Sequence, residues 1–261
     1  MGWDVAAHAT TVVKVVKQTF SELQEENEQF INWLLETYGQ PAKDYFLKYL
    51  QVQLNLIPKD GIEIELPLVK LGTGTISFYP YTVEIQFGPI KDPINLIFHS
   101  NGSAGDIKNI LFQRANPKWY SGFPAKVQYV FISDTGHGGK DEWVRMTDTF
   151  SDRIPPVSLA SRKHVRIFES STGCMHNPGF GKYSIGAVHE DAWNSHFGTP
   201  VDFDKSQIFV EKQFSSLGYK STTWQLQPQG EIVNGVQHDG LASCIEISGA
   251  RPSSIITLTR P

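Results

Sequence analysis

The chain has 261 residues, of which 40% are hydrophobic and 19% charged, with a formal net charge of −4. This balance suits a folded core and excludes general disorder. The acidic balance also excludes a global basic field, so we expect no nucleic-acid partner. No run of about 18 apolar residues occurs, and the N-terminus lacks the apolar stretch of a signal peptide. We therefore expect a soluble, cytoplasmic protein without a transmembrane segment.

The two cysteines, Cys174 and Cys244, are too few for a disulfide framework. They are either two buried thiols or one bridge. Neither stands in a C-x-x-C pair, which argues against a structural zinc site.

Residues 9–38 are predicted to form one long amphipathic helix, because apolar side chains recur at three- and four-residue steps. Gly39 suits the end of this helix, and Pro41 can open a second helix over residues 42–50. The resulting helical hairpin either packs on the main domain or serves oligomerisation or a membrane surface. The turn signal at 58–61 marks the boundary between an N-terminal helical segment, 1–57, and a sheet domain, 58–261.

The rest of the chain predicts an α+β (or α/β) fold, a mixed β-sheet with helices packed mainly on one face and preceded by the N-terminal hairpin. Residues 62–88 alternate and predict a strand pair around Gly72-Thr73-Gly74. Two strand–helix–strand units and three further strands follow; the predicted ranges are 94–98, 104–114 and 127–132, then 183–188, 205–217 and 219–226, with single strands at 164–168, 242–247 and 254–258.

His164 and Arg166 are two residues apart on a predicted strand, so both side chains point to the same face. This pattern predicts a site for phosphate or carboxylate, with Arg166 as the forked donor and Arg162 nearby. Lys140 follows a glycine-rich loop whose backbone N–H groups suit an anion. The alternative is a solvated basic face, or ion pairs to carboxylates.

His189 and Asp191 end another predicted strand, and His238 and Asp239 form a second histidine–carboxylate pair. Together these four side chains predict a mixed nitrogen and oxygen site for Mn²⁺, Fe²⁺ or Zn²⁺. Without a metal, His189, Asp191 and His238 are candidates for general acid–base catalysis. The alternative is that an Asp before a glycine only stabilises a turn.

Four segments, in this order, resemble the C-terminal domain family named after LssY: Asp92-Pro93-Ile94-Asn95-Leu96-Ile97, Arg162-Lys163-His164-Val165-Arg166-Ile167, Gly186-Ala187-Val188-His189-Glu190-Asp191 and His238-Asp239-Gly240. The likeness covers roughly residues 90–250. Members of that family often accompany membrane-embedded lipid-phosphate phosphatase domains. The resemblance therefore implies a lipid-phosphate context, although this chain carries no such membrane partner.

These observations favour a hydrolase that acts on a phosphate ester or lipid phosphate at a His/Asp/Arg site, with or without a divalent metal (Mn, Fe or Zn) as cofactor. One alternative is a non-catalytic accessory module that binds an anionic small molecule or lipid headgroup. Another is a structural protein that forms homo-oligomers through residues 9–38.

Overall fold

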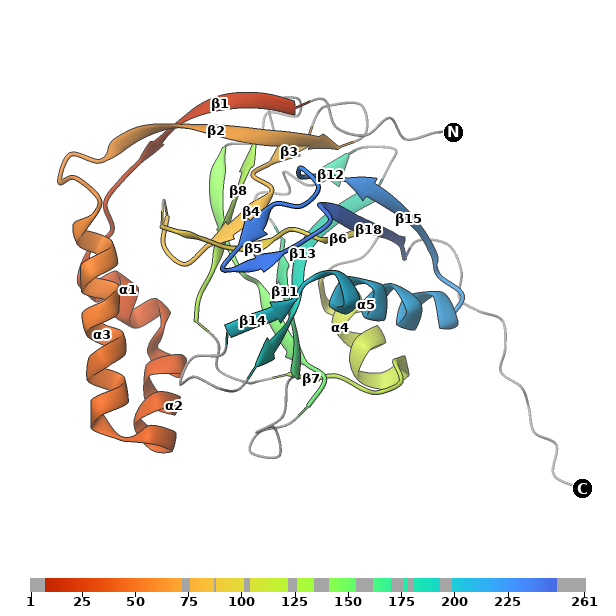
Figure 1. Ribbon diagram of the computed structural model, residues 1–261, viewed down its shortest axis with the longest axis horizontal. Helices are drawn as coiled ribbons and strands as arrows, with labels where there is room; N and C mark the ends of the chain where they lie inside the picture. The colour runs from red at the N-terminus through yellow and green to blue at the C-terminus, as the bar shows by residue number, and fades with distance from the viewer. Residues whose placement is uncertain are drawn as a thin grey trace, which may run out of the picture.

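The computed structural model describes residues 8–71, 76–86, 88–100, 104–121, 126–133, 141–153, 162–169, 176–177, 181–192 and 199–247. Two large β-sheets form the centre of the molecule, and helices lie at two of its sides (Figure 1). One parallel strand pair among many antiparallel pairs makes one of the two sheets mixed. The predicted α+β class is therefore confirmed.

The first sheet is antiparallel and has the strand order β1-β2-β3-β8-β4-β5, with β9 paired to β8. Its two longest strands pair over their full facing length, from His8↔Val69 to Val15↔Ile62. The strands are β1 His8–Val15, β2 Ile62–Leu71, β3 Ile76–Phe78, β4 Tyr81–Val83, β5 Ile90–Pro93, β8 Tyr129–Ser133 and β9 Glu142–Arg145.

The second sheet has the order β15-β18-β6-β13-β11-β10-β7, with β12 and β14 paired to β13. A two-stranded ribbon, β16-β17, stands apart from it. The strands are β6 Leu96–Ser100, β7 Tyr120–Ser121, β10 Asp148–Ser151, β11 Arg162–Phe168, β12 His176–Asn177, β13 Gly181–Ala192, β14 Thr199–Asp202, β15 Lys220–Gln225, β16 Ile232–Val233, β17 Val236–Gln237 and β18 Leu241–Glu246.

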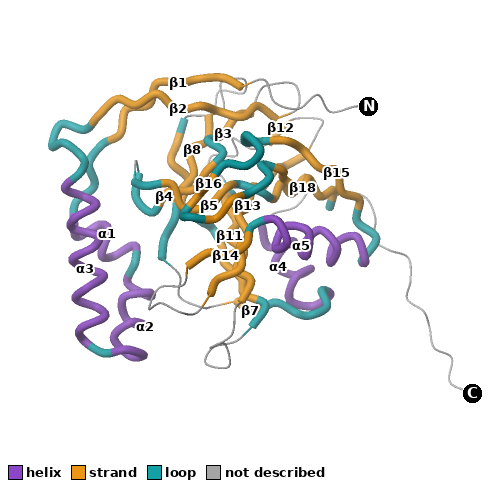
Figure 2. The backbone as a smooth tube through the Cα atoms, in the orientation of Figure 1, coloured by secondary structure: helices purple, strands orange, loops and turns teal. Residues whose placement is uncertain are grey.

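The helices fall into two groups at opposite sides of the sheets (Figure 2). One group packs against the second sheet, because its apolar side chains share a buried cluster with β6, β11 and β13. The other group has a buried cluster of its own. The first group is α4 Ala104–Asn109, a π-helical turn over Ile110–Arg114 and α5 Asp204–Ser216; the second is α1 Phe20–Glu26, α2 Glu28–Tyr38 and α3 Gln40–Asn55.

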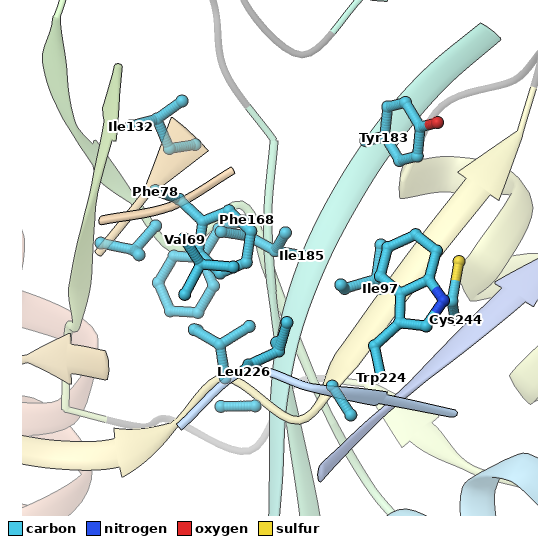
Figure 3. Close-up of a cluster of buried hydrophobic side chains, with 14 of the residues drawn as sticks. Val69, Phe78, Ile97, Ile132, Phe168, Tyr183, Ile185, Trp224, Leu226 and Cys244 are labelled. Atoms are coloured by element: carbon cyan, nitrogen blue, oxygen red, sulfur yellow. The ribbon is translucent and has the colours of Figure 1, made fainter. Parts of the chain in front are cut away.

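The central core lies between the two sheets (Figure 3). Phe78 and Ile132 come from the first sheet, whereas Ile97, Phe168 and Ile185 come from the second. Successive strand residues point to opposite faces, so each sheet donates alternate side chains to this layer. Burial of this apolar surface holds the sheets together.

The helix predicted over residues 9–38 is wrong at its start and is interrupted at Asn27, which caps the helices on either side. Residues 8–15 form β1 instead. Val13 and Val15 are buried, whereas Val12 and Val16 are 68% exposed, and this two-residue alternation belongs to a strand. The β-branched run from Thr10 onward also favours a strand. Pairing with β2 therefore outweighs the weaker helical periodicity.

The first predicted strand–helix–strand unit is also corrected, because β6 and β8 belong to different sheets. The strand pair predicted over 62–88 is confirmed by the antiparallel pairing of β2 with β3, and the strand predicted at 254–258 lies outside the described residues. The division at 57/58 stays a prediction, although the β1–β2 ladder crosses it. Across the described residues, every helix is too short or too polar to cross a membrane.

Candidate functional site

The core face of the second sheet changes from apolar to charged along β11 and β13. On β11, Phe168 lies in the central core, and the residues that share its face toward the strand's start are Arg166, His164 and Arg162. The antiparallel register pairs His164 with His189 and Arg162 with Asp191. All these charged or imidazole residues are at most 6% exposed. The sequence RKHVRIF thus builds a buried polar site at one end of an apolar layer.

Asp191 is one centre of this site. Its carboxylate lies 2.8 Å from His189 Nε2 and 3.6 Å from Arg162 Nε. His164 Nδ1 faces the same carboxylate at 4.0 Å, beyond hydrogen-bond distance. The Nε2 atom of His164 contacts Thr149 Oγ1 at 2.5 Å. Asp191 therefore gathers one arginine and two histidines.

Asp92, at the end of the first sheet's β5, is the second centre. Its carboxylate accepts a hydrogen bond from Arg166 Nη1 at 2.9 Å and lies 3.1 Å from His189 Nδ1. Gln128 also donates to it. Asp92 is only 1% exposed, so these contacts are made away from water. It fixes the orientation of both Arg166 and His189.

His189 bridges the two carboxylates through its two ring nitrogens. Burial alone lowers the pKa of His189, but the negative charges of Asp92 and Asp191 and their hydrogen bonds outweigh it and raise the pKa to about 9. The ring is therefore an imidazolium near neutral pH. Burial raises the pKa of both carboxyls, but the neighbouring cations, with His189 foremost, hold them below their usual range.

His164 has the opposite charge state, although the two imidazole rings have their centroids only 5.9 Å apart. Burial lowers the pKa of His164 well below its ordinary value, and the charges of Arg166, Arg162 and His189 lower it further. It is therefore a neutral imidazole. The site holds one protonated and one neutral histidine side by side.

Three of these side chains, His164, His189 and Asp191, have ligand atoms within 4.8 Å of one another, a spacing that could hold a metal ion. Two facts weigh against a cation there. Both nitrogens of His189 already face carboxylates, and two arginines stand beside the group. With His189 protonated, three positive groups of this cluster face two carboxylates. The excess positive charge suits an anion better than a metal ion.

The other residues predicted for the site lie apart from it or outside the described chain. The ring of Phe203 packs against both histidines, with centroids 6.2 Å from His189 and 6.1 Å from His238. His238 and Asp239 are absent from the close group of ligand atoms found among the described residues. Asp239 instead accepts a hydrogen bond from the backbone N–H of Leu241, as a turn residue does. Lys140 lies outside the described residues.

The alternative that the basic residues of β11 form ion pairs with carboxylates is correct in part. Glu190 pairs with Lys163 at 3.0 Å, and these two residues alternate with the site residues, so they belong to the other side of the sheet. Arg162 pairs with Asp191 within the site.

Sequence reasoning missed Asp92, Thr149 and Tyr38 as neighbours of the site. Asp92 was visible in the quoted Asp92-Pro93 segment, but no local pattern connects it with residues some 70 to 100 positions later. The charge of Arg162 reaches Tyr38 at the end of α2, where burial raises the pKa of the phenol and this arginine partly offsets the rise. Contacts of this kind depend on how the two sheets and α2 pack.

No family model matches the chain, and no match was found among curated proteins or among solved structures. The resemblance to the LssY C-terminal domain stays a prediction.

Proposed function

We propose that the buried cluster around His164 and His189 hydrolyses phosphate esters without a metal ion. A neutral histidine and a protonated histidine lie across one strand pair, between two arginines, and this arrangement carries the proposal. Paired groups whose environments separate their pKa values are a common basis for acid and base roles in one site.

The roles follow from the surroundings of each group. Arg162 and Arg166 bind the oxygens of the phosphoryl group, since guanidinium groups match phosphate geometry. His164 acts as the general base toward a water molecule, because it is neutral and its Nδ1 has no partner within hydrogen-bond distance among the described residues. His189 supplies a fixed positive charge beside the leaving oxygen, because both of its N–H groups already face carboxylates. The leaving oxygen departs as an anion and then takes up the proton that His164 removed from the water. Asp92 and Asp191 keep His189 protonated and oriented.

The enclosure of the cluster limits what can bind there. Each of its charged residues is at most 6% exposed, so a small phosphoryl group fits this site better than a large rigid molecule. The resemblance to the LssY C-terminal domain makes lipid phosphates the first substrates to test, beside soluble monoesters.

A second function has one observation in its favour. Both ring nitrogens of His189 are engaged by carboxylates, which suits a fixed positive charge that attracts an anion. The same cluster would then bind an anionic headgroup without turnover.

The test is hydrolysis of p-nitrophenyl phosphate and of phosphatidate in detergent micelles, with and without a chelator. We expect activity that survives chelation and that falls by about 100-fold in kcat in His164→Asn. The matched control is His99→Asn, a histidine of β6 that stacks on Tyr183 outside the cluster. Phosphate binding without turnover would support the anion-binding function, and loss of activity on chelation would contradict the metal-free reaction. A protein that neither hydrolyses these substrates nor binds phosphate would refute both functions.

A further inference from the structure

The buried cluster holds one more positive group than negative groups. Arg162, Arg166 and His189 face the carboxylates of Asp92 and Asp191. Arginine stays charged in proteins. The ring nitrogens of His189 lie 3.1 and 2.8 Å from carboxylate oxygens, and both must carry hydrogen to face them favourably, as in an imidazolium. Three positive groups against two negative ones leave this cluster with a single net positive charge.

The charged residues on the other side of β11 do not compensate this charge. Lys163 pairs with Glu190 at 3.0 Å. The backbone N–H of Lys163 also donates to the carboxylate of Asp152 at 2.8 Å, and the charge of Arg153 acts on the same carboxylate. These four residues comprise two cations and two anions. They therefore carry no net charge as a group, and the charge of the buried cluster remains unbalanced by them.

A guanidinium donor inside the cluster lacks an acceptor. Nη1 of Arg166 donates to Asp92 at 2.9 Å, whereas its Nε–H has no hydrogen-bond partner among the described residues. Arg166 is only 6% exposed, and a buried donor on a charged group is costly to leave without a partner. A bound anion would supply both the missing acceptor and the missing negative charge.

We propose, building on the function proposed above, that the substrate of this site is a phosphodiester, which carries one negative charge. A singly charged anion brings the cluster to neutrality. A phosphomonoester has its second pKa at about 6 and is mostly a dianion above pH 7, so it would leave one net negative charge in place of one positive charge. The Born cost of removing an ion from water rises with the square of its charge, so a dianion loses about four times as much hydration without any gain in neutrality.

The reaction adds water to the diester. The water oxygen forms a bond to phosphorus, and the bond between phosphorus and one ester oxygen breaks. His164 takes a proton from the water and gives it to the departing alkoxide, so the products are an alcohol and a phosphomonoester. The monoester then loses a proton to solvent and becomes a dianion, which the site binds less tightly. Charge therefore favours both binding of the diester and release of the product.

The first test compares dimethyl phosphate with methyl phosphate, which differ at pH 8 by one methyl group and one charge. Isothermal titration calorimetry with the full chain should give dimethyl phosphate a dissociation constant at least about tenfold lower. At pH 5 methyl phosphate is also a monoanion, so its affinity should approach that of dimethyl phosphate.

Each other outcome of this comparison overturns the inference. Methyl phosphate that binds as tightly as dimethyl phosphate at pH 8, or more tightly, would do so and leave the proposed function intact. A preference that persists unchanged at pH 5 would also do so, because the methyl group and not the charge would then explain it. Binding of neither ion would overturn the proposed function as well.

The second test uses two substitutions on β11. Arg162→Gln removes one positive charge from the cluster and should weaken binding of dimethyl phosphate by at least about tenfold. Lys163→Gln is the matched control, because it removes the same charge from the next residue, on the other side of the sheet, and should change binding by less than about twofold. Equal losses would overturn the role of the cluster charge. Where Arg162→Gln does not fold, the wild-type comparison still decides.

Turnover tests the substrate class directly. At pH 8 methyl p-nitrophenyl phosphate carries one negative charge and p-nitrophenyl phosphate carries two, so KM should be at least about tenfold lower for the diester. An equal or lower KM for the monoester would overturn the inference. Binding of dimethyl phosphate without hydrolysis of either ester would overturn the substrate assignment and leave anion binding as the function of the cluster.

Discussion

The stability of this protein should fall as pH rises from 6.5 to 9, because His189 binds its proton more tightly in the folded chain. Its pKa is raised to about 9, against about 6.5 in an unfolded chain. Within this window the unfolded chain has lost the proton while the folded chain retains it, so a rise in pH favours unfolding. The contribution of the His189 proton to stability is complete below pH 6.5 and is lost by pH 9. The shift corresponds to about 3 kcal/mol.

The perturbation is His189→Asn, and the assay is urea unfolding at several pH values between 6.5 and 9. The wild-type free energy of unfolding should drop by about 3 kcal/mol across this range. The variant should be less stable at pH 6.5, since two buried carboxylates lose their shared cation, and its stability should change little between pH 6.5 and 9.

The control is His99→Asn. Burial lowers the pKa of His99, so its proton-linked contribution lies below pH 6.5 and the alkaline slope should remain. A wild-type stability that changes by less than about 1 kcal/mol between pH 6.5 and 9 would refute the imidazolium assignment. This outcome can be read from the wild type alone, even where the variant does not fold.

Two further substitutions test how the site and strand β1 are supported. Asp92→Asn should cost about 3–5 kcal/mol of unfolding free energy, because an arginine and an imidazolium lose their buried counter-charge. Asp44→Asn on the exposed side of α3 should change it by less than about 0.5 kcal/mol; equal effects in urea melts would contradict this role. Gly61→Ala should lower the free energy of unfolding by more than Gly218→Ala does. At Gly218 the only expected loss is the strain of a left-handed backbone for alanine, about 1–2 kcal/mol. Both glycines have positive φ, but only at Gly61 would a Cβ meet a backbone oxygen, at 2.3 Å; similar losses in thermal unfolding would count against this packing.

Local periodicity determined much of the candidate site. The alternation in RKHVRIF placed Arg162, His164 and Arg166 on one face of β11, and the same period placed His189 and Asp191 on one face of β13. A two-residue period depends only on backbone geometry, so it can be read from a short segment. The same reasoning failed at β1, where a run of valines matched helical and strand patterns and pairing with β2 decided between them.

The tertiary structure decided which of these faces meet. The β11–β13 register sets His164 beside His189, and β5 of the other sheet brings Asp92 between Arg166 and His189. The ring of Phe203 packs against both His189 and His238. None of these contacts leaves a local pattern in the chain. Strand register and sheet packing are settled by the fit of residues far apart in sequence, and the charge states of the two histidines follow from that fit.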